Sequence, residues 1–138
     1  MNCYIDSSVV LSALFGQRGV FAKHWRKISE GASSELLVVE CNRVIDRYRL
    51  QGELDDDGIA AVKSALNHFV SGITLFSLER RILELASHSF PTVVGTLDAI
   101  HLSTALIWKN SIKKDIVLFS NDTRLCTAAK ALGISMMP

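Results

Sequence analysis

Four acidic side chains lie where a strand is expected to end or a helix to begin. Asp6 follows "CYI", Glu40 follows "LLVV" and Asp122 follows "VLFSN", so each comes just after an apolar run. Asp98, in "GTLDAIHL", opens a run with helical spacing. Carboxylate oxygens and water are the ligands that Mg²⁺ and Mn²⁺ prefer. If the fold brings the four side chains together, their chemistry is that of a divalent-cation site.

Each acid also has a simpler structural interpretation. Asp6 and Asp122 are placed to cap helices, and Asp98 lies in a first helical turn, where the helix dipole favours negative charge. Glu40 is harder to explain in this way because glutamate is a poor N-cap. Four acids on one rim would raise one another's pKa values unless a positive charge lies among them. The repeated arrangement therefore favours a common site, with the divalent cation as the compensating charge.

The elements that must position these acids alternate along the chain. Apolar runs typical of strands cover residues 3–5, 33–39, 73–78, 115–120 and 134–137. A first helix is expected to end near residues 15–19, and further helices are expected over residues 20–31, 40–52, 59–72, 78–90, 97–110 and 122–133. The run "DDDG" at residues 55–58 is interpreted as a helix N-cap with its first-turn charges.

This alternation of strands and helices predicts an α/β layered fold with parallel pairing. The C-terminal ends of parallel strands share one edge of the sheet, and ligands bind at that edge. We therefore expect Asp6, Glu40 and Asp122 to converge there, with Asp98 joining them from the start of its helix.

Length and composition predict one globular domain covering residues 1–138, with 49% hydrophobic residues to form its core. The apolar run "VVLSALF" has 7 residues, whereas a membrane helix needs roughly 20. No basic segment precedes this run, so neither a membrane span nor a secretory signal is expected.

The three cysteines and the net charge restrict the class of protein further. Cys3, Cys41 and Cys126 lie far apart and have no spacing typical of a zinc site, which favours a reducing cytoplasm. A net charge of +1 is not the basic footprint that nucleic-acid-binding proteins usually carry, so the charge neither supports nor excludes an RNA partner.

Four segments of the chain resemble, in order and spacing, the acidic motifs of PIN-domain ribonucleases. They are "YIDSS", "ECNRV", "LDAIHLSTA" and "FSNDTRLCTAAKALG". The resemblance covers essentially the whole chain and is strongest to the toxin subunits of VapBC toxin–antitoxin pairs. It implies that Asp6, Glu40, Asp98 and Asp122 are the metal-binding acids. One departure is Asn121, which stands where the family often has an apolar residue.

The resemblance also implies a fold and an activity. The fold would be a three-layer α/β sandwich, with a central, mostly parallel sheet of four or five strands and helices on both faces. Its first and fourth strands would be neighbours. The activity would be that of an endoribonuclease that depends on Mg²⁺ or Mn²⁺, cleaves structured RNA such as tRNA or rRNA, and is paired with an antitoxin protein. The alternative within this family is a catalytically silent module that binds RNA or protein.

Several other side chains are expected to support the acids. By the resemblance, Ser7 and Ser120 match positions that orient the carboxylates. His101 lies one turn beyond Asp98, and we interpret it as a buried or supporting histidine rather than a general base. Arg43, at i+3 from Glu40, is expected to steady that acid, to meet phosphate or to form an ordinary ion pair.

Three questions stay open at this level. The general base is either Glu40 or Asp122, and the number of ions is one or two. The apolar side chains of the early helices are candidates for a homodimer or antitoxin groove, with core packing as the alternative. These side chains are Leu14, Phe15, Phe21 and Trp25.

Two other α/β classes fit the sequence less well. A receiver-type phosphoacceptor domain needs paired acids at its first strand and a lysine after a late strand, and "CYID" and "FSND" offer neither. A dinucleotide-binding domain needs a G-x-G-x-x-G turn, and none follows any expected strand.

Overall fold

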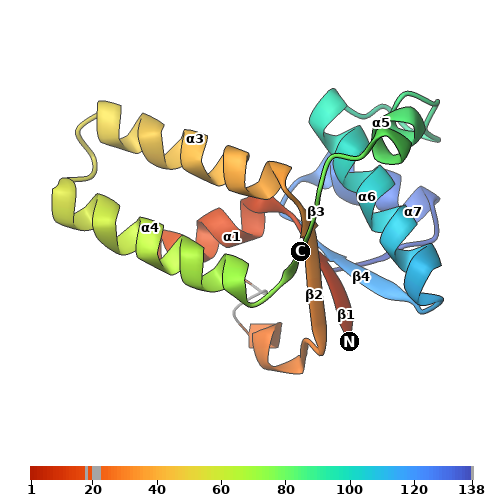
Figure 1. The fold of residues 1–138 in the computed structure, drawn as a ribbon, viewed down its shortest axis with the longest axis horizontal. Coiled ribbons are helices and arrows are strands. Elements are labelled where there is room, and N and C mark those ends of the chain that lie inside the picture. The colour runs from red at the N-terminus through yellow and green to blue at the C-terminus, as the bar shows by residue number, and fades with distance from the viewer. Residues whose placement is uncertain (18, 20–22, 138) are drawn as a thin grey trace.

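A single parallel sheet organises the protein, for which a computed structural model describes residues 1–17, 19 and 23–137. The strands are β1 (Asn2–Ile5), β2 (Glu30–Ser34), β3 (Thr74–Phe76), β4 (Ile116–Phe119) and β5 (Ser135–Met137). Their order in the sheet is β3–β2–β1–β4–β5, and every pairing is parallel (Figure 1). The switch in strand order therefore lies between β1 and β4, which are neighbours as expected.

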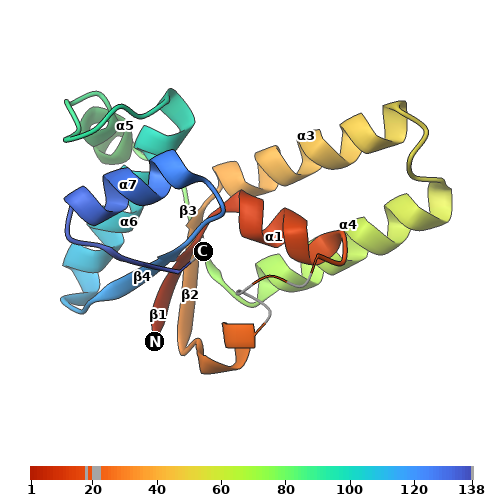
Figure 2. The same ribbon diagram turned by 180° about the vertical axis from the view of Figure 1, so that it is seen from behind.

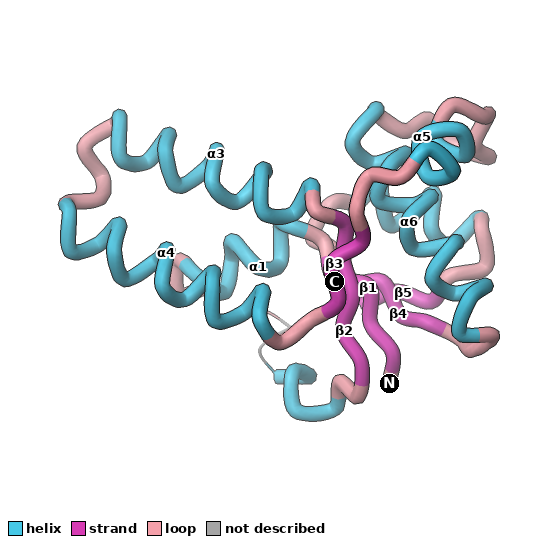
Figure 3. Tube along the Cα trace, in the orientation of Figure 1, coloured by secondary structure: helices cyan, strands magenta, loops and turns pink. Residues whose placement is uncertain are grey.

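Helices cover both faces of this sheet. One face carries α1 (Ser7–Leu14), α3 (Leu36–Leu50) and α4 (Asp56–Ser71), and the other carries α5 (Arg80–Ala86), α6 (Thr96–Ile112) and α7 (Thr123–Ala131). Figure 2 shows the same two layers from behind, and Figure 3 shows how far the α3–α4 hairpin extends beyond the sheet. The expected three-layer α/β fold is confirmed. No helix in the described ranges is long and apolar enough to cross a membrane.

Strands β1 and β4 carry apolar runs because these neighbouring strands are buried on both faces of the sheet. In β1, the side chains of Cys3 and Ile5 pack into the cluster beneath α1, α3 and α4, while Tyr4 packs into the cluster beneath α6 and α7. In β4, Phe119 and Leu118 divide between the two clusters in the same way. Each fully buried side chain of this size stabilises the fold by about 1.5–3 kcal/mol relative to exposure. A one-residue slip in register would exchange the two sets.

The prediction of a strand over residues 33–39 is wrong for the second half of that range. Strand β2 ends at Ser34, and the residues "LLVV" form the first turn of α3. The reason is visible in which side chains are buried: Leu37, Cys41 and Ile45 are spaced by four residues and are almost fully buried. That spacing is helical, so the apolar run belongs to a helix face rather than to a strand.

The helix expected over residues 20–31 is also not observed as one element. Val20 and Phe21 lie outside the described residues. Further along, a short 3₁₀ helix, η1 (Trp25–Lys27), is followed by Ser29, whose N–H donates to the Met1 carbonyl, and then by β2. Pairing with β1 therefore overrides the helical spacing of this segment.

Two helix ends follow the sequence closely. The Oδ1 of Asp55 accepts a hydrogen bond from the N–H of Gly58 at 2.7 Å, so "DDDG" caps α4 as expected. Gly52 follows α3 with φ +73°, a conformation that favours glycine, and so stops that helix.

Candidate metal centre

Two of the four acids are brought together by the pairing of β1 with β4. Asp6 comes directly after β1 and is the N-cap of α1, whereas Asp122 comes after β4 and is the N-cap of α7. The register pairs Ile5 with Phe119, and the N–H of Asp6 donates to the Phe119 carbonyl at 3.0 Å. Both carboxylates therefore lie at the C-terminal edge of the sheet, beside its switch point.

The carboxylate of Asp6 is buried, and one of its two oxygens is held by the fold. Its Oδ2 accepts hydrogen bonds from the hydroxyl of Ser8, from the N–H of Ser8 at 3.3 Å and from the hydroxyl of Ser120 at 2.8 Å. Among the described residues, its Oδ1 has no hydrogen bond, and it lies 4.0 Å from Nε2 of His101. Asp6 thus caps α1 with one oxygen, and the hydrogen bonds of the cap leave the other oxygen unoccupied.

Asp122 divides its oxygens in the same way. Its Oδ1 accepts the backbone N–H groups of Arg124 at 2.8 Å and Leu125 at 3.0 Å, which caps α7. Its own N–H donates to Ser120 Oγ at 3.0 Å, so one serine bonds to both acids. Within the described ranges, no hydrogen bond reaches Asp122 Oδ2. Capping and ligand binding are therefore compatible at both positions.

Asp98 lies in the first turn of α6 and faces the same two acids. Burial raises the pKa of its carboxyl, and the negative charges of Asp122 and Asp6 raise it further. The carboxylate of Asp98 lies close to Gly95, the residue before α6: if Gly95 carried a Cβ atom, the one atom within 4 Å of it would be Asp98 Oδ2, at 3.9 Å. The three aspartates therefore share one region of negative charge, and Asp98 experiences its repulsion.

Glu40 approaches the site from α3 and is held by a buried histidine. His101 is 1% exposed, and its Nε2 lies 2.8 Å from Glu40 Oε2. Its Nδ1 lies 3.0 Å from the hydroxyl of Tyr4, which is also fully buried. The ring is therefore fixed at both nitrogens, and it orients Glu40 at the edge of the centre.

The acids around His101 change its pKa. Burial alone would lower the pKa of this histidine, but the hydrogen bond and charge of Glu40, with the charges of Asp6 and Asp98, outweigh burial and raise it. The surrounding acids therefore favour the protonated form of His101.

Among the described residues, possible ligand atoms of Asp6, Glu40 and His101 lie within 4.8 Å of one another, and this group does not include Asp98 or Asp122. In the part of the chain that the structure describes, no lysine or arginine forms an ion pair with any of the four acids. The donors that remain free of capping are hard carboxylate oxygens, which suit Mg²⁺ or Mn²⁺. The residues present therefore fit a divalent cation of this kind.

Two of the expected supporting residues are placed differently. The side chain of Arg43 is 74% exposed and pairs with Asp46 at 3.3 Å, so among its three interpretations the ordinary ion pair is the one observed. Ser7 is buried at the start of α1, but the neighbouring Ser8 provides the hydroxyl that bonds to Asp6.

Asn121, the departure from the family pattern, connects the two sides of the switch point. Its N–H donates to Ser8 Oγ at 2.9 Å, and its side-chain amide donates to Ser12 Oγ at 2.9 Å and to the Ser8 carbonyl at 3.2 Å. The residue thus fixes α1 against the turn between β4 and α7. In the sequence, Asn121 is visible only as an amide residue between an apolar run and an acid. Its partners Ser8 and Ser12 lie more than 100 positions away along the chain.

Comparisons with known proteins identify the family of this chain. The PIN domain family model matches residues 3–131. The chain is 29% identical over 136 residues to Ribonuclease VapC46 of Mycobacterium tuberculosis, covering 97% of this chain and 95% of that protein. It is 26% identical over 137 residues to Ribonuclease VapC47 of the same species, covering 94% and 91%.

A solved structure shares the fold. The crystal structure of VapBC2 from Rickettsia felis, bound to a DNA fragment from their promoter, matches with a TM-score of 0.70 and 11% identity, over 99% of this chain and 98% of that one. Together with the sequence relatives, it confirms the resemblance inferred from the acidic motifs. This chain belongs to the PIN-domain family.

Proposed function

We propose that this protein is a metal-dependent endoribonuclease and the toxin of a type II toxin–antitoxin pair. Membership of the PIN-domain family and similarity to two proteins named as VapC ribonucleases support the proposal. The observation that carries it is the way the acids are held. Asp6 and Asp122 each use one oxygen to cap a helix and have no hydrogen bond on the other among the described residues; their charges raise the pKa of Asp98, and Glu40 has an oxygen within 4.8 Å of one of Asp6.

In this proposal Asp6, Glu40, Asp98 and Asp122 would hold Mg²⁺ or Mn²⁺. When bound, the ion would supply positive charge to a phosphate and lower the pKa of a water molecule. The chain's own contribution is positioning: Ser8 and Ser120 fix Asp6. If either Glu40 or Asp122 is not engaged in holding the ion, that carboxylate would take the proton from the water.

The contact between His101 and Glu40 bears on the choice of base. His101 Nε2 lies 2.8 Å from Glu40 Oε2, so one oxygen of this carboxylate is already engaged. Asp122 accepts two backbone N–H groups on one oxygen and none among the described residues on the other. Each candidate thus has one engaged oxygen, and this arrangement leaves both candidates open.

The proposed substrate is a structured RNA of the tRNA or rRNA class, cut in an unpaired segment. Single-stranded loops present bases and phosphates that a protein groove can reach, whereas duplex RNA is recognised mainly by shape. A net charge of +1 gives little general attraction to polyanions. Recognition by local shape is therefore expected to matter more than the overall charge.

The proposed partners are a cognate antitoxin and a second copy of the chain, in the cytoplasm. Trp25, an early apolar side chain, is 41% exposed, whereas Leu14 and Phe15 pack against the core beneath α1. Phe21 lies outside the described residues. Of the candidate groove residues, Trp25 is thus the one with exposed apolar surface, and the others follow the core-packing alternative as far as they are described.

Expression in a bacterium tests the proposal directly. Wild type should arrest growth and Asp98→Asn should not, because the substitution removes a charged ligand while preserving the shape of the side chain. Asp115→Asn is the matched control, since the Asp115 side chain is 99% exposed, and it should arrest growth as wild type does. Purified wild type should cleave RNA with Mn²⁺ or Mg²⁺ and lose that activity in EDTA. Wild type that is harmless and cleaves no RNA with either ion would overturn the proposal.

The alternative is a PIN-like module that binds RNA or protein without cutting. Binding of RNA that is unaffected by Asp98→Asn, with no cleavage in either protein, would favour this alternative. The intact set of acids argues against it, because a binding module has no need for carboxylates that repel one another.

A further inference from the structure

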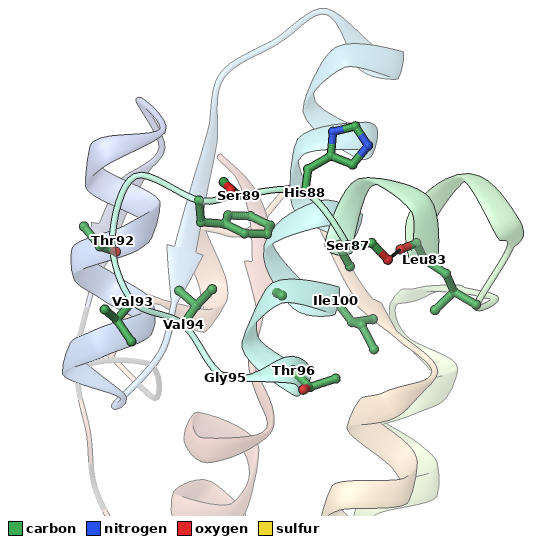
Figure 4. A pocket seen from close by; sticks show the side chains of 13 residues that line it. Leu83, Ser87, His88, Ser89, Thr92, Val93, Val94, Gly95, Thr96 and Ile100 are labelled. Carbon is green, nitrogen blue, oxygen red and sulfur yellow. Dashed lines mark hydrogen bonds between the residues drawn. The ribbon is translucent and has the colours of Figure 1, made fainter.

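A pocket of about 610 Å³ opens beside the candidate metal centre. It lies between α5 and the start of α6 and is bordered by the loop of residues 87–95; we call it the flank pocket. Figure 4 shows Val93 and Val94 on one side of this space and Leu83 and Ile100 on the other. Pockets that bind small ligands have volumes of about 300–1,000 Å³, so the flank pocket is large enough for a nucleobase.

The flank pocket shares a wall with the acid cluster. Gly95 lines it and is the N-cap of α6, and Thr96 and Ala99, from the first turn of that helix, also line it. Asp98 lies on the same turn, and its Oδ2 is 3.9 Å from the point where a Gly95 Cβ would stand. The pocket and Asp98 thus share one helical turn, and we expect adjacent parts of one nucleotide to reach both.

The lining of the pocket suits an uncharged, partly apolar group. Among the described residues, no lysine, arginine or acidic side chain lines it, and His88 is the one titratable side chain there. Leu83 and Val93 expose 42% and 83% of their surface there. Apolar side chains of this kind contact the faces of a base, as in other proteins that bind unpaired nucleotides.

Polar groups in the same wall suit the edge of a base. Ser87, Ser89 and Thr96 bring hydroxyls to the pocket. Hydroxyls of this kind can donate to or accept from the exocyclic and ring atoms of a base.

We infer that the flank pocket binds an unpaired nucleobase of the RNA, next to the phosphate held at the acid cluster. This inference rests on the proposed ribonuclease function. A base within a duplex is stacked and paired on both sides, so only an unpaired base can enter a recess of this kind. The pocket would then select which nucleotide lies beside the cut.

Cleavage of a random-sequence, single-stranded RNA pool measures this selection. Wild type should favour one or two bases at a fixed position beside the cut. The double substitution Leu83→Asn and Val93→Asn should reduce kcat/KM for the favoured sequence about tenfold, mainly through KM, and flatten the preference. Leu50→Asn on α3 is the matched control, because Leu50 is 69% exposed and lies outside the pocket. Unchanged preference in the double variant would overturn the inference and leave the ribonuclease proposal standing.

Binding in EDTA separates the two proposals. AMP, CMP, GMP and UMP are titrated against wild type by NMR, with ribose 5-phosphate as the probe that lacks a base. At least one nucleotide should bind about tenfold more tightly than ribose 5-phosphate, and Asp98→Asn should retain that difference. If wild type binds the nucleotide and cuts no RNA, the ribonuclease proposal fails and the base site stands. If all five probes bind equally, the base site fails.

Discussion

The charge of Asp98 is expected to destabilise the protein when no metal is bound. Burial and the neighbouring carboxylates of Asp122 and Asp6 raise the pKa of Asp98 in the folded state. A raised pKa for an acid means that folding penalises the ionised form, so the penalty is fully present above the folded pKa. Asparagine has nearly the same shape and no charge. Asp98→Asn should therefore raise the melting temperature in EDTA at neutral pH.

The size of the effect follows from the partial exposure of Asp98. Two unit charges 4 Å apart interact by about 4 kcal/mol at an effective dielectric constant of 20, but solvent reaches this carboxylate, and screening reduces exposed interactions strongly. We expect relief of about 1 kcal/mol. For a chain of this length, 1 kcal/mol corresponds to about 3–4 °C in Tm. The difference should vanish as the pH falls below about 4, where the acid is protonated in both folded and unfolded states.

Thermal melts followed by circular dichroism, in EDTA and in Mn²⁺, provide the assay. In Mn²⁺ the order should reverse, because wild type gains about 2.7 kcal/mol at an ion concentration 100 times its Kd and the variant has lost a ligand. Asp115→Asn makes the same change in net charge at an exposed position and should shift Tm by less than about 1 °C in either buffer. A Tm for Asp98→Asn that falls in EDTA would refute the account of repulsion, even if the protein cleaves RNA.

Three further predictions concern the groups that hold the acids. Ser120→Ala removes a hydrogen bond to Asp6 and should lower the free energy of unfolding in urea by about 1–2 kcal/mol, whereas Ser71→Ala, at an exposed helix end, should change it by less than about 0.5 kcal/mol. Tyr4→Phe removes the hydroxyl at His101 Nδ1 and should lower the free energy of unfolding by about 1 kcal/mol in the same assay. An unchanged free energy of unfolding would count against a stabilising hydrogen bond between Tyr4 and His101. The raised pKa of His101 stabilises the metal-free fold fully below about pH 6.5, and this contribution is lost as the pH rises through the folded pKa. His101→Gln should therefore flatten the fall in Tm as the pH rises above about 6.5, and an identical slope would contradict the raised pKa of this ring.

Much of the fold and part of the site could be predicted from local patterns. The acids Asp6 and Asp122 follow short apolar runs, and the rule that parallel strands end at one edge places them together without any knowledge of distant contacts. Asp98 was located by its place at the start of a helical run. These predictions rest on periodicity and on the chemistry of helix starts, both of which act over a few residues.

Glu40 was located for a reason that is partly wrong. The run "LLVV" is compatible with a buried strand or with a buried helix face, and a short apolar run cannot distinguish them. The deciding signal lies further along, in the four-residue spacing of Leu37, Cys41 and Ile45. Glu40 still reaches the site because α3 begins two residues after β2 ends, at the same edge of the sheet. The prediction therefore identified the correct edge although it assigned the wrong element.

The groups that hold the acids could not be predicted because their contacts are long-range. Ser120 bonds to Asp6 across 114 positions, and no local pattern distinguishes Ser8 from Ser7 as the serine that faces the carboxylate. The structure also shows that the two interpretations of these acids, helix capping and metal binding, do not exclude each other. A carboxylate has two oxygens, and a helix N-terminus needs only one of them. Capping fixes the rotamer of Asp6 and Asp122, so the same hydrogen bonds that begin α1 and α7 aim the second oxygen at the sheet edge. An acid that caps a helix at a strand end is for this reason better prepared to bind a cation than one on a free side chain, since the entropy of holding it is already lost on folding.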